Sequence, residues 1–427
     1  MNKGGKRKAL RRKCFPLFLA YPHILYHKLV QEENLYKRKR WTSMNGFVKK
    51  MVPVLLTVLI LTPFLPVKTM AMTVTAPGAI VMDQETGRIF YGKNEHEKMR
   101  IASITKIMTA IIAIESGKLD EKVTVSERAV KTEGSSVYLQ VGEKITLRDL
   151  VYGLMLRSGN DAAVAIAEHV GGSVEGFVYL MNEKAALIGM TNTHFMNPHG
   201  LDTHEDHYST AYDMAILTRY AMENETFREI SGTRVHRVPH PEGWMREWHN
   251  KHRLLTGLYK YTTGGKTGYT KRANRTLVTT AEKDGMELIA VTLNSRSSTD
   301  WYDHIHMFEQ VFANYEYETI LKEGTIAAVK DPVYKNKAYL EHAFIYPISE
   351  EEKESFAINY RLIQPEKSWA RNEEKIPELI GKAEIYFNDE LIHTMPVYFE
   401  KEQSADRSIF HQVGKMFFDL IGVNSDD

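Results

Sequence analysis

Apolar positions between Thr73 and Tyr317 follow two different spacings along the chain. Strand-like stretches bounded by turn residues stand at both ends of this region, and stretches with helical spacing lie between them. The predicted strands are 79–82, 88–91, 276–281 and 288–293, and the predicted helices are 102–115, 147–156, 162–170, 174–188, 211–221 and 303–312. Because strands at both ends enclose the helices, we expect one sheet flanked by helices.

The pattern changes after about Glu318. Apolar and polar residues alternate over 358–362, and similar short stretches follow at 385–387 and 397–399. Asn388-Asp389 is a turn signal between the last two stretches, and prolines punctuate the whole segment. These features predict a small all-β domain.

A third pattern occupies residues 408–423, where apolar residues recur at helical spacing. The apolar positions are Ile409, Phe410, Val413, Met416, Phe417, Leu420 and Ile421. An amphipathic helix that follows the last strand is typical of an anchor lying in the plane of a membrane surface. The alternative is a helix that packs on its own domain.

The N-terminal segment predicts export. Lys49 and Lys50 precede an apolar run over 51–65, and Thr69-Met70-Ala71 resembles a cleavage site with small residues. The run is shorter than the roughly 20 apolar residues of a spanning helix, although an uncleaved anchor remains the alternative. Met44 is an alternative start that would leave an ordinary signal peptide.

Charge and cysteine content exclude some function classes. The net charge of +1 gives no field that would attract nucleic acid, so we expect no nucleic-acid partner. The single cysteine, Cys14, lies upstream of the predicted cleavage site. The mature chain would then have no thiol, disulfide or cysteine-ligated metal, and any nucleophile must be of another type.

Ser103 and Lys106 form an S-x-x-K motif at the start of the predicted helix 102–115. Residues three apart share a helix face, so the hydroxyl and the amine can meet within one turn. A serine hydroxyl needs a neighbouring base, and a lysine can serve if burial and nearby positive charge lower its pKa. Free N–H groups at a helix start also suit a developing oxyanion. Alone, such a motif occurs about once or twice by chance in a chain this long.

Two further motifs follow. Ser158-Gly159-Asn160 comes after helix 147–156 and can project a hydroxyl and an amide into a cleft, although a glycine helix cap is the common alternative. Lys266-Thr267-Gly268, continued by Tyr269 and Thr270, leads towards the last strands. Gly268 would permit another backbone to approach closely, and a substrate could pair as an added strand with the edge of this segment. The alternative is an ordinary glycine-rich hairpin.

The order and spacing of the three motifs resemble those of penicillin-binding proteins, with Gly159 where an aspartate is usual. The blocks Arg100–Thr109, Leu156–Ala162 and Asn197–Asp202 resemble those of the D-alanyl-D-alanine carboxypeptidases among the low-molecular-mass members. The resemblance covers roughly Met72–Tyr398. Segments 149–173 and 208–222 look closest to the sporulation-type enzyme of endospore-forming bacteria.

The resemblance implies an α/β (α+β) catalytic domain like that of serine β-lactamases and transpeptidases. The implied organisation is an extension and signal peptide (1–71), this domain (72–318), a β-rich domain (319–403) and a membrane-anchor helix (404–427). It implies no cofactor. The implied partners are peptidoglycan stem peptides, β-lactams and, through the last helix, the outer face of the cytoplasmic membrane.

The resemblance also implies residue roles. Ser103 would attack the terminal D-Ala-D-Ala bond, Lys106 would take its proton, and Ser158 would relay a proton to the leaving amine. The backbone N–H groups of Ser103 and Tyr269 would form the oxyanion hole. The implied substrate-binding residues are Asn160, Lys266, Thr267, Gly268, Tyr269 and Thr270.

Competing interpretations predict different residues. Histidines 194, 199, 204 and 207 cluster in one loop, but no H-E-x-x-H motif accompanies them and we expect no metal site. A β-lactamase would carry E-x-x-L-N between Asn160 and Lys266, and that pattern is absent. A penicillin-sensing scaffold without activity would retain the fold, although the intact catalytic set argues against it. An endopeptidase that cleaves cross-links would use the same residues as a carboxypeptidase.

Overall fold

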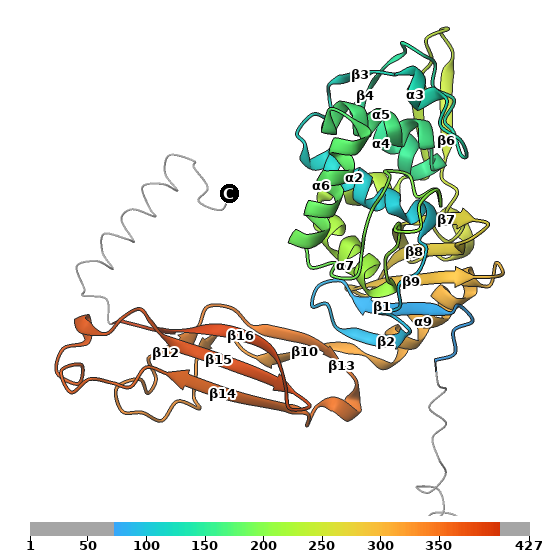
Figure 1. The fold of residues 1–427 in the computed structure, drawn as a ribbon. Coiled ribbons are helices and arrows are strands. Elements are labelled where there is room, and N and C mark those ends of the chain that lie inside the picture. The colour runs from blue at the N-terminus through green and yellow to red at the C-terminus, as the bar shows by residue number, and fades with distance from the viewer. Residues whose placement is uncertain (1–71, 402–427) are drawn as a thin grey trace, which may run out of the picture. The chain divides into compact units, whose positions relative to one another are not determined.

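The computed structural model describes residues 72–401 (Figure 1). The first of its two five-stranded sheets is antiparallel, with the strand order β2-β1-β9-β8-β7. The strands are β1 (Gly78–Asp83), β2 (Ile89–Lys93), β7 (Thr262–Thr270), β8 (Asn274–Lys283) and β9 (Met286–Ser295). Strand β1 pairs with β9, so the two ends of this region meet in one sheet. The prediction of a sheet flanked by helices is confirmed.

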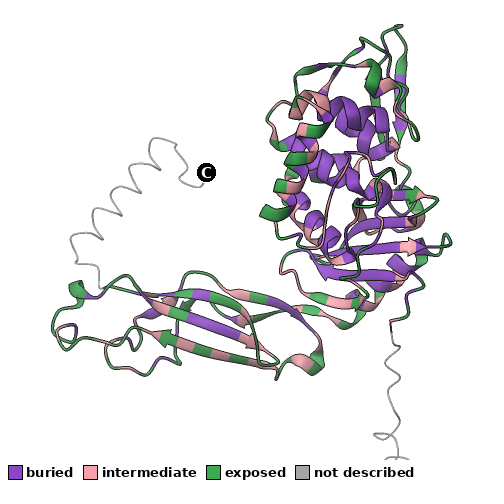
Figure 2. Ribbon diagram, in the orientation of Figure 1, coloured by how far each residue is buried: buried purple, intermediate pink, exposed green. Residues whose placement is uncertain are grey.

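Strand β1 explains why the sheet is covered on both faces. All six of its residues are buried (Figure 2), and alternate residues of a strand point to opposite faces. Ile80 and Met82 pack into the core made with the helices that follow in sequence, whereas Ala79 and Val81 pack into a second core containing Trp301. The short apolar run in the sequence therefore belongs to a strand between two cores.

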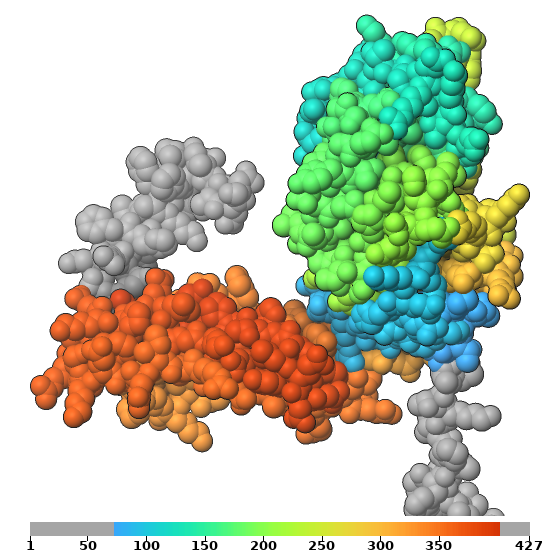
Figure 3. All heavy atoms as spheres, viewed as in Figure 1, coloured from blue at the N-terminus to red at the C-terminus, as the bar shows by residue number. Residues whose placement is uncertain are grey.

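Helices surround the sheet, and in the space-filling view of Figure 3 the green and teal helical residues form one continuous surface above the blue strands. The helices are α2 (Lys106–Glu115), α3 (Glu127–Val130), α4 (Leu147–Tyr152), α5 (Asn160–Gly171), α6 (Val174–Leu187), α7 (Ala211–Met222), α8 (Glu225–Gly232) and α9 (Asp300–Asn314). Helix α2 is central, because its residues from Lys106 to Ile114 are all buried. The catalytic lysine predicted from sequence therefore starts the most enclosed helix of this core.

Two predicted α-helices contain a turn of another helix type near the candidate site. The predicted helix 102–115 begins with a 3₁₀ turn, η2 (Ala102–Thr105), before α2. The predicted helix 147–156 is α4 followed by a π-helical turn, η3 (Gly153–Arg157). Such tightened or widened turns cannot be read from apolar spacing, and they often occur at functional sites.

Two pairs of short strands and the short helices α3 and α8 were not predicted. Strands β3 (Lys122–Thr124) and β4 (Lys144–Thr146) form a short ladder, and β5 (Val235–Pro239) pairs with β6 (Met245–His249). In β6 exposed and buried residues alternate, because only one face of this hairpin packs on the domain.

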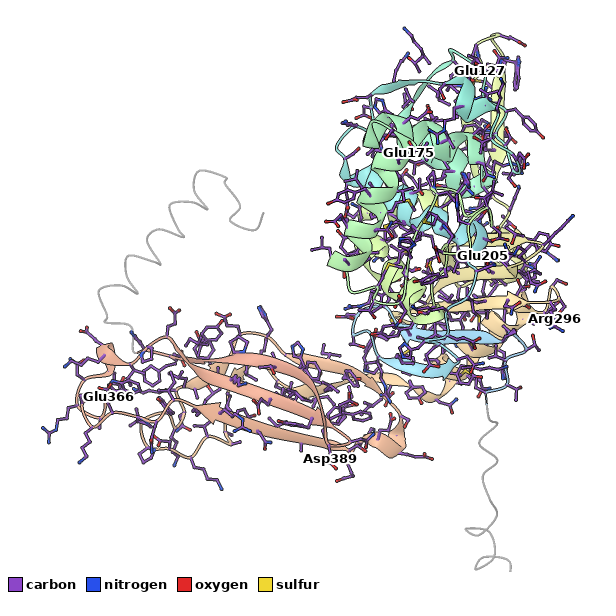
Figure 4. All side chains as sticks on the ribbon, viewed as in Figure 1. Glu127, Glu175, Glu205, Arg296, Glu366 and Asp389 are labelled. Atoms are coloured by element: carbon purple, nitrogen blue, oxygen red, sulfur yellow. The ribbon has the colours of Figure 1, made fainter. Side chains whose placement is uncertain are left out.

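The β-rich region after α9 was predicted and is confirmed. Its sheets run in the orders β10-β13 and β11-β12-β16-β15-β14. The strands are β10 (Glu316–Leu321), β11 (Gly324–Thr325), β12 (Ala338–Leu340), β13 (Phe344–Ile348), β14 (Phe356–Leu362), β15 (Leu379–Phe387) and β16 (Glu390–Phe399). Asn388 and Asp389, the latter labelled in Figure 4, both have positive φ, as a two-residue hairpin turn requires. The predicted limit at residue 319 falls inside β10 and stays a prediction.

The predicted signal peptide and the amphipathic tail lie outside the described residues. Within 72–401, none of the helices combines the length and the apolar character needed to cross a membrane.

Candidate active site

Ser103 lies in the 3₁₀ turn η2, directly before α2. The preceding residue, Ala102, has φ +49, a left-handed conformation that costs a non-glycine residue about 1–3 kcal/mol. The hydroxyl of Thr105 donates to the Ala102 carbonyl at 2.8 Å, which helps to hold the turn. This strained turn brings the Ser103 hydroxyl to the start of α2.

The Lys106 amine is fully buried and has three oxygen neighbours. Its Nζ lies 3.1 Å from Ser103 Oγ, 2.7 Å from Asn160 Oδ1 and 2.5 Å from the His199 carbonyl. A neutral amine has two N–H groups and one lone pair. The two carbonyl oxygens accept the N–H groups, so the lone pair remains for the Ser103 hydroxyl proton.

Electrostatics favour that neutral amine. Burial lowers the pKa of Lys106 well below its usual value, and the positive charges of Lys266 and Lys251 lower it further. Asp161 acts in the opposite direction but is the smallest contribution. The site therefore has a hydroxyl and a base of suitable protonation state within hydrogen-bonding distance.

A loop that closes over Lys106 supplies the His199 carbonyl. Asn197 shapes this loop, because its Oδ1 accepts from Gly200 N at 2.6 Å and from His199 N at 3.2 Å. Gly200 has φ +87, and a Cβ there would lie 1.9 Å from the Ala102 carbonyl oxygen. Only glycine therefore lets the loop approach the nucleophile turn so closely. The block Asn197–Asp202 was noted in the sequence, but the role of its backbone was missed.

Ser158 follows the π-helical turn η3 and has φ +66 and ψ +32. This left-handed residue ends η3, and Asn160 then begins α5. The Asn160 side chain accepts from Lys106 and donates from Nδ2 to the Glu133 carbonyl at 2.6 Å. It thus positions the base, a role that sequence reasoning missed. The Glu133 carbonyl takes one of the two Nδ2 hydrogens, and the other is available for a ligand. The predicted contact of Asn160 with substrate stays a prediction.

Lys266 on β7 joins the second and third motifs. Its Nζ donates to Ser158 Oγ at 3.1 Å and to the Thr267 carbonyl at 2.8 Å. Burial, and then the charge of Lys251, lower the pKa of Lys266 to about 7. Ser158 therefore lies beside an amine whose charge changes near neutral pH.

Strand β7 also brings Gly268 against the nucleophile turn. A Cβ on Gly268 would lie 2.9 Å from Ser103 N and 2.3 Å from Thr276 Oγ1. Thr276 Oγ1 donates to the Ile101 carbonyl at 2.8 Å, which ties β8 to the same turn. Because β7 is the last strand of the sheet order, its outer edge can pair with an extended peptide.

A cleft of about 410 Å³ opens at this junction. Of the predicted residues, Ser103, Ser158, Thr267, Gly268 and Tyr269 line it. Lys106, Asn160 and Lys266 are buried beside the lining hydroxyls. Thr270 is not among the lining residues, and its hydroxyl accepts from Ala273 N at 2.9 Å.

Sequence reasoning missed several residues of this cleft, namely Ser135, Lys251, Arg253, Arg275, Ser298 and Trp301. Arg275 lies opposite Tyr269 in the β7–β8 register and donates to Asp300 at 2.9 Å. That register follows from hairpin pairing, so a sequence search for cations opposite the third motif could have found Arg275. Three cationic residues in one small cleft favour an anionic ligand.

The histidine cluster has structural roles. His207 Nε2 lies 2.9 Å from Thr105 Oγ1, and His207 Nδ1 accepts from Met196 N at 3.0 Å. Burial is the main cause that lowers the pKa of His199 to about 3. Among residues 72–401, no three His, Cys, Asp or Glu side chains lie close enough together to hold a metal ion.

Comparisons with known proteins identify the family of this chain. A family model described as D-alanyl-D-alanine carboxypeptidase matches residues 66–297, which contain all three motifs. The chain is similar to the D-alanyl-D-alanine carboxypeptidase DacF of Bacillus subtilis, with 36% identity over 295 residues, 66% of this chain and 74% of the relative.

Two solved structures extend the similarity. The D-alanyl-D-alanine carboxypeptidase DacD of Francisella tularensis matches 78% of this chain and 95% of its own, with 28% identity and a TM-score of 0.62. Penicillin-binding protein 5 of Haemophilus influenzae matches 77% of this chain and 97% of its own, with 26% identity and a TM-score of 0.63.

Replacing Lys251 tests the electrostatic coupling. In Lys251→Met, the pKa values of Lys106 and Lys266 both rise, because a nearby positive charge no longer disfavours their protonated forms. The roles predicted from the sequence require a neutral Lys106 and a charged Lys266, so both the acid and the alkaline limb of the pH profile should move to higher pH. The measurement is the rate of Ser103 acylation by a labelled penicillin against pH. Exposed Lys122→Met is the control, and unmoved limbs in Lys251→Met would contradict the coupling.

Gly200→Ala tests the close approach of the loop. Both Gly200 and Gly189 have positive φ, at +87 and +85, but a Cβ on Gly189 meets no atom within 4 Å. We expect Gly189→Ala to lose about 1 kcal/mol of stability from its positive φ alone. Gly200→Ala should lose more, because its Cβ must also displace backbone atoms, and only this variant should slow acylation, by at least about tenfold. Thermal unfolding and penicillin labelling measure the two effects. Equal acylation rates in the two variants would show that this contact does not position Lys106.

Proposed function

The chain belongs to the family of D-alanyl-D-alanine carboxypeptidases, and from this premise we propose that Ser103 is the nucleophile that removes the terminal D-alanine from peptidoglycan stem peptides. One observation carries the assignment. The N–H groups of neutral Lys106 have two carbonyl acceptors, so its lone pair can face Ser103 Oγ, 3.1 Å from Nζ. The predicted likeness to sporulation-type enzymes agrees with the match to DacF.

Acylation begins with a stem peptide that pairs with the outer edge of β7. Its terminal carboxylate lies among the cleft cations, of which Arg275 is held by Asp300. Ser103 Oγ attacks the carbonyl of the last peptide bond while Lys106 Nζ takes the hydroxyl proton. The oxyanion accepts from the backbone N–H groups of Ser103 and Tyr269, and the close contact between Gly268 and Ser103 N supports this pairing.

The leaving D-alanine needs a proton on its amine. The Ser158 hydroxyl supplies it as the C–N bond breaks, and the proton held by Lys106 restores that hydroxyl. Charged Lys266, 3.1 Å from Ser158 Oγ, orients the hydroxyl and favours its transient negative charge. The products are free D-alanine and an ester on Ser103.

Water completes the reaction. A water molecule attacks the ester carbonyl and loses a proton to Lys106, and that proton passes to Ser103 Oγ as the ester bond breaks. The shortened peptide then leaves with a new carboxylate. A penicillin enters the same route when Ser103 opens its β-lactam ring, but its leaving nitrogen stays tethered in the cleft.

We also propose that the chain works at the outer face of the cytoplasmic membrane, attached by residues 408–423. The support is the apolar face of that segment together with its place soon after β16, the last described strand. Peptidoglycan, the substrate of this family, lies outside the cytoplasm.

Two substitutions test the nucleophile and the base. Ser103→Ala should abolish labelling by fluorescent penicillin and D-alanine release, because no hydroxyl remains. Lys106→Ala should fold yet lose acylation by at least about 10³-fold, because no base remains. Thermal unfolding checks that both variants are folded. Normal labelling of either folded variant would overturn the assignments, as would faster hydrolysis of penicillin than of a D-Ala-D-Ala peptide.

Truncation tests the attachment. A chain that ends at Asp406 should be released from membranes while keeping its D-alanine release, because the apolar face is lost and the catalytic cleft is not. A full-length variant with Phe410→Glu and Phe417→Glu should also be released from membranes. The control Lys415→Glu, on the predicted polar side, should leave a larger fraction of the protein on the membrane than the double variant does. Membrane fractionation measures this. Membrane retention of the truncated chain would place the anchor elsewhere.

A further inference from the structure

Four apolar side chains stand exposed on two segments that are distant in sequence, and we call this group the aromatic rim. Tyr138 is 80% exposed, Val141 61%, Trp244 50% and Met245 56%. The Gln140 side chain donates to Glu242 at 3.3 Å and so joins the two segments. In Figures 1 and 3 the hairpin that carries Trp244 lies beside the teal residues at the top of the molecule.

The first segment of the aromatic rim is held in a fixed and costly conformation. Tyr138 has φ +60, which is rare for a bulky residue. Its backbone N–H donates to Ser136 Oγ at 2.8 Å, and the buried Asp161 carboxylate accepts from Val137 N at 3.0 Å and Leu139 N at 3.2 Å. The protein thus maintains strain in order to expose this ring, as functional loops commonly do.

The second segment is equally well supported. The Trp244 ring stacks on His240 with centroids 4.0 Å apart. Below it, Arg246 donates to Glu143 at 3.0 Å, and both side chains are buried, so the hairpin is tied to the segment that carries Val141. Rings that are fixed before a ligand arrives lose little entropy on binding.

Both segments lead directly into the catalytic cleft. Tyr138 follows Ser135 by three residues and Trp244 precedes Lys251 by seven, and both Ser135 and Lys251 line the cleft. At about 3.3 Å per residue, the aromatic rim lies within roughly 10–23 Å of the cleft lining. The four residues of a stem pentapeptide before the reacting carbonyl span about 14 Å when extended. The length of the peptide is thus comparable with the separation between the cleft lining and the rim.

We propose that the aromatic rim binds the glycan strand of the substrate, a deepening that rests on the proposed carboxypeptidase function. The C–H face of a pyranose ring is apolar and its edge is polar, which matches amphipathic rings bordered by Gln140 and Glu242. The chain then acts preferentially on stem peptides still attached to sugar.

The test compares two substrates with the same peptide, a disaccharide-linked pentapeptide and the sugar-free pentapeptide. The variant combines Trp244→Ala with Tyr138→Asn, since asparagine tolerates positive φ while removing the ring. We expect kcat/KM on the disaccharide substrate to fall at least about tenfold, mainly through KM. Release of D-alanine from the sugar-free peptide and acylation by penicillin should not change. The matched control is Tyr179→Ala, a ring on α6 that is 64% exposed, and it should alter neither substrate.

Several results would overturn the proposal. An equal fall on both substrates would mean that these residues only support the cleft, and no change on either would exclude a sugar site. Unchanged rates together with lost binding to phosphatidylglycerol vesicles would make the rim a membrane contact. Failure of the carboxypeptidase assignment is distinguishable, because the wild-type chain would then release no D-alanine from the sugar-free peptide either.

Discussion

A buried lysine amine with two carbonyl partners is the constraint on which the site depends. Lys106 is fully enclosed, so its charge is disfavoured and its N–H groups need acceptors. Asn160 and the His199 carbonyl provide those acceptors from two segments far apart in sequence. The start of α5 and the loop over α2 must therefore both be in place before the amine can serve Ser103. The proposed chemistry at Lys106 therefore depends on the correct fold of the helical core.

Two glycines allow the segments around Lys106 to come close enough to form this site. Gly268 lets the edge strand β7 meet the nucleophile turn, and Gly200 lets the loop meet the same turn from another segment. A side chain at either position would overlap backbone atoms. The result is a cleft in which a peptide can extend one sheet edge while its reacting carbonyl lies between hydroxyl, amine and N–H donors.

The sequence predicted helices α2, α4, α5, α6, α7 and α9, strands β1, β2, β8 and β9, and the meeting of three motifs, because apolar spacing and the short S-x-x-K interval are local signals. It missed the short helices α3 and α8. It did not predict η2 or η3, since both turns depend on the packing around them. It missed the His199 carbonyl, because a backbone acceptor has no signature in residue type. It missed the β5–β6 hairpin and with it Trp244, since the turn chemistry there was overlooked.

The buried amines also have a thermodynamic consequence. Lys266 has a pKa of about 7 in the folded chain, against the ordinary lysine value of 10.5. Between those values the unfolded chain binds more protons, so folding becomes more favourable as pH rises through this window and carries the full penalty below it. Catalytic power and robustness are therefore in opposition at this position. An apolar side chain here would remove that penalty, but under the proposed mechanism it would also remove the charge that orients Ser158.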